Sequence, residues 1–140
     1  MDNDLSYSIL MSVYAKEQPD FLRSAIESML SQTCSSDDFV LVCDGPLTPE
    51  LDSVIDEYKE RLHILRLEKN SGLGCALNEG LKLCRHDLVA RMDSDDISLP
   101  DRCEKQLEMF AADPDLAIAG GQLSEFNEDS DISIGVRSVP

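Results

Sequence analysis

Apolar and polar positions along the chain follow two alternating periods, which predicts strands separated by helices. Short apolar runs typical of buried strands recur along the sequence, and apolar residues at helical spacing stand between them. The predicted strands are Tyr7–Tyr14, Phe39–Cys43, Leu62–Leu67, Leu88–Met92 and Leu116–Ala119, with a last short strand near Ile132–Val136 after a polar, hairpin-like excursion.

Helices are predicted in the gaps between these strands. Thr48 followed by Pro49 has the residue types of an N-cap and a first helical position. Asp113-Pro114 is expected to close the last helix, which opens at Pro100. The apolar stripes consist of Phe21, Leu22, Ala25, Ile26, Met29 and Leu30 after Asp20; Leu51, Val54, Ile55 and Tyr58; Leu73, Ala76, Leu77, Leu81 and Cys84; and Leu107 and Phe110.

This order of elements predicts the fold class. Strands that alternate with helices need crossover connections, so we expect an α/β protein with a mostly parallel sheet and helices on both faces, a Rossmann-like three-layer sandwich. A chain of 140 residues fits one domain. Ligands of such open sheets bind beyond the carboxyl ends of the strands. Functional residues are therefore expected in the loops after Tyr14, Cys43, Leu67, Met92 and Ala119.

The net charge of the chain limits the classes of molecule that it can bind. Twenty-eight acidic and 12 basic side chains give a formal net charge of −16, which repels nucleic-acid backbones and anionic lipid. We therefore expect no nucleic-acid partner, and an anionic substrate would need a metal ion or backbone donors. No apolar run approaches the ~20 residues of a spanning helix, and the first ten residues have no basic segment of a signal peptide.

The cysteines indicate a reducing compartment. Their number, five, is odd and no Cys-x-x-Cys pair occurs, so the sequence predicts neither a disulfide framework nor a thiolate zinc site. Free thiols fit the cytoplasm, and hard-cation chemistry would have to come from carboxylates.

The acidic cluster Asp93, Asp95 and Asp96 is the strongest candidate for chemistry. Three carboxylates at a strand end repel one another, and a divalent cation is the usual means of neutralising them. In extended chain, the side chains of residues two apart point the same way, so Asp93 and Asp95 can bind the same Mg²⁺ ion. The alternative is a solvated acidic turn that caps the next helix.

Three weaker candidates follow other predicted strands. Asp44 is placed where nucleotide-binding sheets often carry a carboxylate that accepts a hydrogen bond from a ribose or base, although Asp-Gly-Pro is also a common turn. The segment 70–74, Asn-Ser-Gly-Leu-Gly, is similar to a phosphate-binding turn at a helix N-terminus, or it simply starts a tightly packed helix. Tyr14 can offer a flat face to a base or pack in the core.

Taken in order, several motifs resemble family 2 glycosyltransferases over about Tyr7 to Phe110. The sequences Ser-x-x-x-Gln-Thr before the second strand and Asp-x-Asp-Asp before Pro-x-Arg are the most specific part of the resemblance. The matching segments are Ser12-Val13-Tyr14, Ala25 to Thr33, Asp44-Gly45, Asn70 to Gly74, Ala76 to Gly80, Met92 to Asp96, and Leu99 to Arg102.

The resemblance implies a nucleotide-diphospho-sugar transferase fold and a role for each matched residue. It implies transfer of a sugar from a nucleotide-diphosphate donor, most commonly a UDP-sugar, to an acceptor hydroxyl, usually with inversion, in polysaccharide or glycolipid synthesis. The implied cofactor is Mg²⁺ or Mn²⁺, and the implied acceptor is a sugar or a lipid-linked sugar. The implied donor-binding residues are Ser12, Tyr14, Asp44, Asn70, Gly72 and Asp93, and the implied metal-binding residues are Asp95, Asp93 and Asp96.

The same resemblance implies that residues 1–140 are the donor-binding part of a longer protein. Family members continue into an acceptor-binding region that supplies the general base, so that base is expected beyond Pro140. Within 127–140 the acidic residues Glu128, Asp129 and Asp131 stand in a polar segment with no apolar neighbours. We expect such a fragment to self-associate through uncovered apolar surface, and the full-length protein to be cytoplasmic, at the inner face of the membrane.

Two other functions fit parts of the pattern. Met92 to Asp95 is similar to the nucleophile motif of haloacid-dehalogenase-like phosphatases, but that motif normally ends the first strand. A receiver-like regulatory domain would also be a five-stranded acidic module. It would need an acidic pair after the first strand and a Lys after the fifth, where this chain has Tyr14-Ala15 and Gly120-Gly121.

Overall fold

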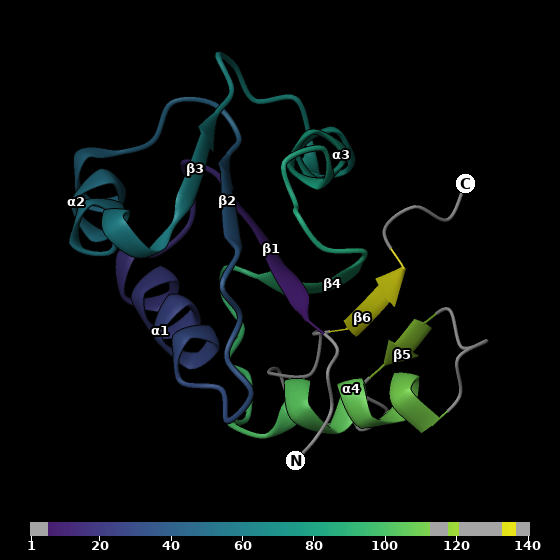
Figure 1. The fold of residues 1–140 in the computed structure, drawn as a ribbon. Coiled ribbons are helices and arrows are strands. Elements are labelled where there is room, and N and C mark those ends of the chain that lie inside the picture. The colour runs from purple at the N-terminus through teal and green to yellow at the C-terminus, as the bar shows by residue number, and fades with distance from the viewer. Residues whose placement is uncertain (1–5, 113–117, 121–132, 137–140) are drawn as a thin grey trace.

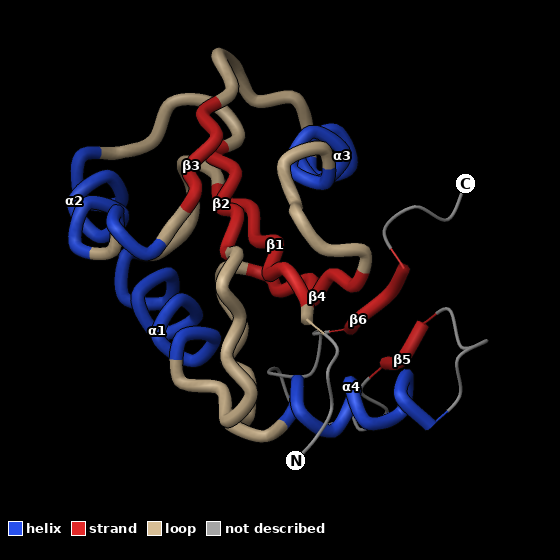
Figure 2. Tube along the Cα trace, in the orientation of Figure 1, coloured by secondary structure: helices blue, strands red, loops and turns tan. Residues whose placement is uncertain are grey.

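A computed structural model describes residues 6–112, 118–120 and 133–136. It shows three layers, in which one sheet lies between two layers of helices (Figures 1 and 2). Helix α3 covers one face of the sheet, and α1, α2 and α4 pack on the other. Among the described helices, none has the length and apolar character needed to cross a bilayer. The elements are β1 Tyr7–Val13, α1 Pro19–Leu30, β2 Phe39–Cys43, α2 Pro49–Glu57, the 3₁₀ turn η1 Lys59–Arg61, β3 His63–Arg66, α3 Leu73–Leu81, β4 Leu88–Asp93, α4 Arg102–Ala112, β5 Ile118–Gly120 and β6 Ser133–Val136.

The described strands form a six-stranded sheet in the order β3-β2-β1-β4-β6-β5. The pairs β1–β2, β1–β4 and β2–β3 are parallel, which confirms the predicted mostly parallel sheet and fold class. Strand β6 is antiparallel to both β4 and β5, so it separates the fourth strand from the fifth. The predicted helix end at 113–114 and the polar excursion at 127–131 lie outside the described residues.

The core is divided by the alternation of side chains along the central strand β1. Tyr7, Ile9, Met11 and Val13 point to the cluster formed with α1, α2 and α4, while Leu10 points to the cluster under α3. Parallel strands covered on both faces are apolar at nearly every position, which is why these runs are nearly continuous in the sequence.

Two residues of the predicted apolar stripes are not in the core. Phe21 is 54% exposed and Leu73 is 50% exposed. Helix α1 begins at Pro19 with Gln18 as its N-cap, so Asp20 lies inside the first turn, and Phe21 lies on its outer side. Leu73 is the first residue of α3 and faces the cleft described below. Both residues lie in the first turn of their helices.

A hydrogen-bonded clamp joins the end of α1 to the chain that follows β4. The buried Gln32 amide donates through Nε2 to the Ser98 hydroxyl at 3.0 Å and to the Leu99 carbonyl at 2.8 Å. Its Oε1 accepts the Cys103 N–H at 3.0 Å, in the first turn of α4. The Ser28 hydroxyl also accepts the Ser98 N–H at 3.0 Å.

The clamp gives the two most specific motifs of the sequence a physical basis. Ser-x-x-x-Gln-Thr supplies one side of it, and the segment 98–103 that contains Pro-x-Arg supplies the other. Thr33 N–H completes it by donating to the Pro100 carbonyl at 2.8 Å. The segment that follows the acidic cluster is therefore held at residues 98–103 by hydrogen bonds between uncharged groups.

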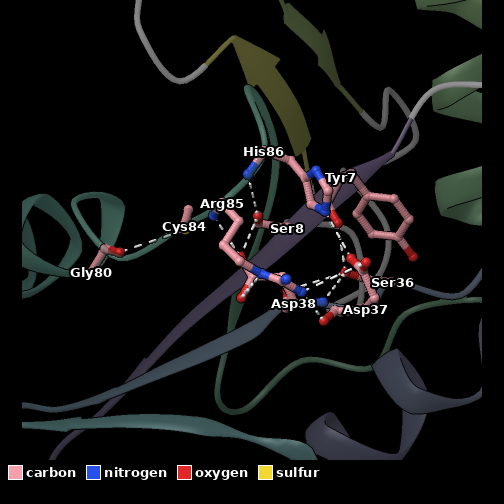
Figure 3. Close-up of polar contacts among 9 residues, drawn as sticks. All are labelled: Tyr7, Ser8, Ser36, Asp37, Asp38, Gly80, Cys84, Arg85 and His86. Carbon is pink, nitrogen blue, oxygen red and sulfur yellow. Dashed lines mark hydrogen bonds and ion pairs between the residues drawn. The ribbon is translucent and has the colours of Figure 1, made fainter.

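At the opposite edge, a buried polar network joins the amino-terminal ends of the strands (Figure 3). The buried Asp38 carboxylate accepts the Ser8 hydroxyl at 2.6 Å and the Arg85 N–H at 2.7 Å, and the Ser8 oxygen accepts the His86 N–H at 3.1 Å. His86 Nε2 lies 2.7 Å from Asp37, and this hydrogen bond holds the pKa of Asp37 below its usual value. The network ties β1 and β2 to the turn before β4, which fixes how their carboxyl ends align.

We expect Gln32→Ala to lower the free energy of unfolding by about 2–3 kcal/mol, because it leaves buried N–H and C=O groups without partners. Urea unfolding followed by circular dichroism measures the change. Gln18→Ala is the matched control, since the Gln18 side chain makes no capping hydrogen bond. Equal stabilities of the two variants would contradict the assigned role of the clamp.

Candidate functional site

A cleft of about 400 Å³ opens at the carboxyl ends of β1, β2 and β4. It brings together most of the residues that the sequence singled out, which come from four separate loops. Asp96 is the exception, since it is buried beside the cleft and not part of its wall. The lining residues are Ser12, Tyr14, Glu17, Asp44, Asn70, Gly72, Leu73, Asp93, Ser94 and Asp95.

Strand register explains this convergence. Val13 pairs with Cys43, and Ser12 pairs with Asp93, both in parallel ladders. The residues after β1 and β2, Tyr14 and Asp44, must therefore lie at the same edge as the end of β4. The sheet itself positions these side chains, and the loops add only their orientation.

Asp44 organises the loop that precedes α3. Its Oδ1 accepts the Ser71 N–H at 2.7 Å, and its Oδ2 accepts the Gly72 N–H at 3.1 Å. The Asn70 side-chain amide donates to the Asp44 carbonyl at 3.3 Å. Two N–H groups of the predicted phosphate-binding turn thus point to Asp44. A carboxylate has about four lone-pair positions, so Asp44 retains capacity for a further donor.

Two glycines shape these loops, and one of them lets the loops meet backbone against backbone. Gly45 and Gly72 have φ values of +94° and +96°, in the region where side chains are strained. A Cβ on Gly45 would lie 2.6 Å from the Asn70 nitrogen, which no side chain tolerates. Gly45 is therefore required for the Asp44 carboxylate to reach the 70–72 turn.

The acidic cluster is compact enough to bind one ion. Carboxylate oxygens of Asp93, Asp95 and Asp96 all lie within 4.8 Å of one another. The Asp96 N–H donates to the Asp93 carbonyl at 3.2 Å and closes the turn, while Asp95 is exposed at its tip. Arg91 Nη2 lies 3.3 Å from Asp93 Oδ1 and partly compensates its charge. This set of hard oxygen ligands fits Mg²⁺ or Mn²⁺.

The wall of the cleft is strongly acidic. It carries four carboxylates, Glu17, Asp44, Asp93 and Asp95, and none of the described residues that line it is Lys or Arg. A phosphate-bearing ligand would meet only like charge there, so its binding would need a cation that comes with it.

Glu17 and Ser94 are site residues that sequence reasoning missed. The Ser94 hydroxyl donates to Glu17 Oε1 in a short hydrogen bond, and Glu17 Oε2 accepts the Gln18 N–H at 3.0 Å. Glu17 stands three residues after Tyr14, in a loop already marked by its place after a strand. An acidic residue so close to a predicted strand end was the available signal.

Cysteine contributes no thiolate to this edge. Burial raises the pKa of the Cys43 thiol, at the end of β2, to about 11, so it is protonated and neutral at pH 7. None of the five cysteines, all of which lie within the described residues, forms a disulfide bond. The ligands available at the cleft are therefore oxygen atoms.

Comparison with known proteins identifies a family and related sequences. The model of the family described as glycosyl transferase family 2 matches residues 8–135. A protein of Haemophilus influenzae described as an uncharacterized glycosyltransferase is 46% identical over 97% of this chain and 52% of its own length. The UDP-Gal:alpha-D-GlcNAc-diphosphoundecaprenol beta-1,3-galactosyltransferase of Escherichia coli is 40% identical over 99% of this chain and 51% of its own length. The chain thus spans about half the length of these relatives.

The fold has matches among solved structures. A mannosyltransferase from Pyrobaculum calidifontis, solved in complex with GDP-Man and Mn²⁺, superimposes with a TM-score of 0.79 at 14% identity over 96% of this chain and 46% of its own. At that identity the likeness concerns the fold alone, and it confirms the predicted nucleotide-sugar transferase type.

These matches agree with the sequence pattern. The acidic motif ends the fourth strand along the chain, as in the family 2 pattern, and not the first strand as in the phosphatase alternative. The phosphatase and receiver-domain alternatives accordingly have no support from the family match. By its match over residues 8–135 and its 40–46% identity to the two relatives, the chain belongs to glycosyl transferase family 2.

Proposed function

We propose that this chain binds the nucleoside-diphosphate sugar donor of a glycosyltransferase, with Mg²⁺ or Mn²⁺ at Asp93, Asp95 and Asp96. The observation that carries the proposal is the acidic cleft, whose wall has four carboxylates and, among the described residues, no Lys or Arg. Such a wall suits a diphosphate only when a divalent cation accompanies it. Family membership makes a nucleotide sugar the expected diphosphate ligand.

The two apolar side chains of the cleft are suited to a planar base. Tyr14, 46% exposed, stands at the end of β1, and Leu73, half exposed, stands at the start of α3. An exposed aromatic ring gains by stacking on a base. The Asp44 carboxylate lies in the same wall, where it can accept a hydrogen bond from the N–H of a base.

The chemistry assigned to the whole protein is transfer to an acceptor hydroxyl. The acceptor oxygen attacks the anomeric carbon, the bond from that carbon to the diphosphate oxygen breaks, and a general base takes the hydroxyl proton. A bound divalent cation supplies positive charge against the departing diphosphate. In this chain, Asp93 and Asp95 would hold the cation near the diphosphate end of the donor, and Tyr14 and Asp44 would bind its base.

The names of the relatives support a proposal for the donor and acceptor classes. The Escherichia coli relative is named for a UDP-galactose donor and a lipid-diphosphate acceptor. We propose a UDP-sugar as donor, a lipid-linked sugar as acceptor, and a place in polysaccharide or glycolipid synthesis at the inner face of the membrane. Acceptor binding and the general base are assigned to the part of the protein beyond these 140 residues.

Removing the exposed Asp95 carboxylate tests the metal site. We expect Mn²⁺ to strengthen binding of UDP or GDP to the wild-type chain, and Asp95→Ala to abolish this gain without unfolding the protein. Isothermal titration calorimetry with and without Mn²⁺ measures it. Asp87→Ala is the matched control, because Asp87 is an exposed carboxylate at the opposite end of β4. Equal nucleotide affinities with and without metal in the wild type would refute the assignment.

A second test separates base recognition from phosphate recognition. We expect Asp44→Ala to weaken UDP binding by about 1–3 kcal/mol, the cost of a lost buried hydrogen bond, and to leave binding of inorganic pyrophosphate with Mn²⁺ nearly unchanged. Competition titrations with the two ligands give the comparison. Equal losses for both would remove Asp44 from the base pocket.

A third test concerns transfer. We expect the 140-residue chain to bind donor but to turn it over at least ~10²-fold more slowly than the full-length protein, because a missing general base alone forfeits that much. A nucleotide-release assay with several UDP-sugars and lipid extracts, run on both proteins, measures the difference. Size-exclusion chromatography of the same samples reports the expected self-association of the shorter chain. Comparable turnover would place the base within residues 1–140.

A further inference from the structure

Glu17 connects two loops that line the cleft, the loop after β1 and the acidic turn after β4. Its backbone N–H donates to the Tyr14 carbonyl at 3.0 Å, which closes a tight turn after β1. Its carboxylate accepts the hydroxyl of Ser94, the residue between Asp93 and Asp95. The residue therefore contacts both the loop that carries the aromatic ring and the turn that carries the acidic cluster.

Ser94 needs such an anchor because of its neighbours. Carboxylates on both sides repel each other, and the turn itself is closed by the hydrogen bond from Asp96 N–H to the Asp93 carbonyl. The Ser94 side chain is buried against Glu17, and the far end of the segment is held by Ser98 in the Gln32 clamp. The acidic turn is thus held near its start by Glu17 and near its end by Gln32.

We propose that Glu17 is a positioning residue: by accepting the Ser94 hydroxyl it orients Asp93 and Asp95 for metal-dependent donor binding. This inference rests on the proposed function of the cleft. The alternative role is that of a direct metal ligand, because Glu17 also lines the cleft. Both Glu17 oxygens accept hydrogen bonds from the chain itself, Oε1 from Ser94 and Oε2 from Gln18 N–H, so the carboxylate is held in one orientation against the acidic turn.

The charge of Glu17 and its hydrogen bond can be separated by substitution. Glu17→Gln retains an oxygen that accepts the Ser94 hydroxyl but removes the charge, whereas Glu17→Ala removes both. Ser94→Ala removes the bond from the other side. Glu60→Ala is the matched control for net charge, because Glu60 is exposed on η1 and outside the cleft.

Calorimetry measures the UDP affinity of each variant with and without Mn²⁺. Electron paramagnetic resonance measures its Mn²⁺ binding, and thermal unfolding measures its stability. We expect Glu17→Ala and Ser94→Ala each to weaken the Mn²⁺-dependent affinity roughly tenfold, the scale of one hydrogen bond to a charged group. The double variant should lose no more than either single one, because both remove the same contact. Glu17→Gln should stay within about threefold of wild type, since a neutral acceptor keeps part of that bond.

Three results would overturn the inference. Additive losses in the double variant would show that Glu17 and Ser94 act independently. An equal loss in Glu17→Gln and Glu17→Ala would show that the charge matters and not the contact, as for a metal ligand. A wild-type chain without any Mn²⁺ effect would instead remove the proposed function. If Mn²⁺ strengthens UDP binding equally in the wild type and in all Glu17 and Ser94 variants, the role of Glu17 is refuted and the proposed function stands.

Discussion

Parallel pairing of β1 with both of its neighbours is the constraint on which the arrangement of the cleft depends. Val13 is level with Cys43 and Ser12 with Asp93, and the ladder continues one residue further through the bond from Asp44 N–H to the Val13 carbonyl at 2.8 Å. A slip of one residue in either pairing would turn the side chains to the other face and bring a different set to the edge. The convergence of acidic side chains at one place is therefore a property of the sheet and not of the loops.

That convergence has an electrostatic cost, and the chain lowers it mainly with neutral groups. Backbone N–H groups stabilise Asp44, and a hydroxyl and a backbone N–H stabilise Glu17. Arg91 approaches Asp93 without lining the cleft. Hydrogen bonds of this kind satisfy the carboxylate oxygens without adding positive charge to the wall. Had lysines taken their place, the cleft would hold a phosphate directly and would have little use for a divalent cation.

The sequence predicted the elements well because burial follows apolar periodicity, and it predicted the site less completely because a site depends on contacts between distant segments. The order of the last strands, with β6 between β4 and β5, has no periodic signal. Phe21 and Leu73 fit apolar stripes yet are half exposed, since periodicity does not show which residues of a first helical turn other elements cover. Gln32 belonged to a recognised motif, but its partners Ser98 and Leu99 across the clamp lie 66 and 67 residues away. The contact of Ser94 with Glu17 spans 77 residues and is invisible to any local pattern.

The packing of α3 against the sheet has a consequence for how the cleft can vary. A Cβ added at Gly80 would lie 2.5 Å from Leu10 Cδ1 and 2.7 Å from Val42 Cγ2, so the helix rests on the sheet as closely as its backbone allows. About two helical turns separate Gly80 from Leu73 at the cleft. A side chain at position 80 has to be accommodated by repacking of two buried residues or by tilting of the helix, and a tilt moves Leu73 relative to Tyr14. The width of the cleft is thus set in part by the contact between α3 and the sheet, and a substitution at position 80 can change the shape of the cleft without altering any residue that lines it.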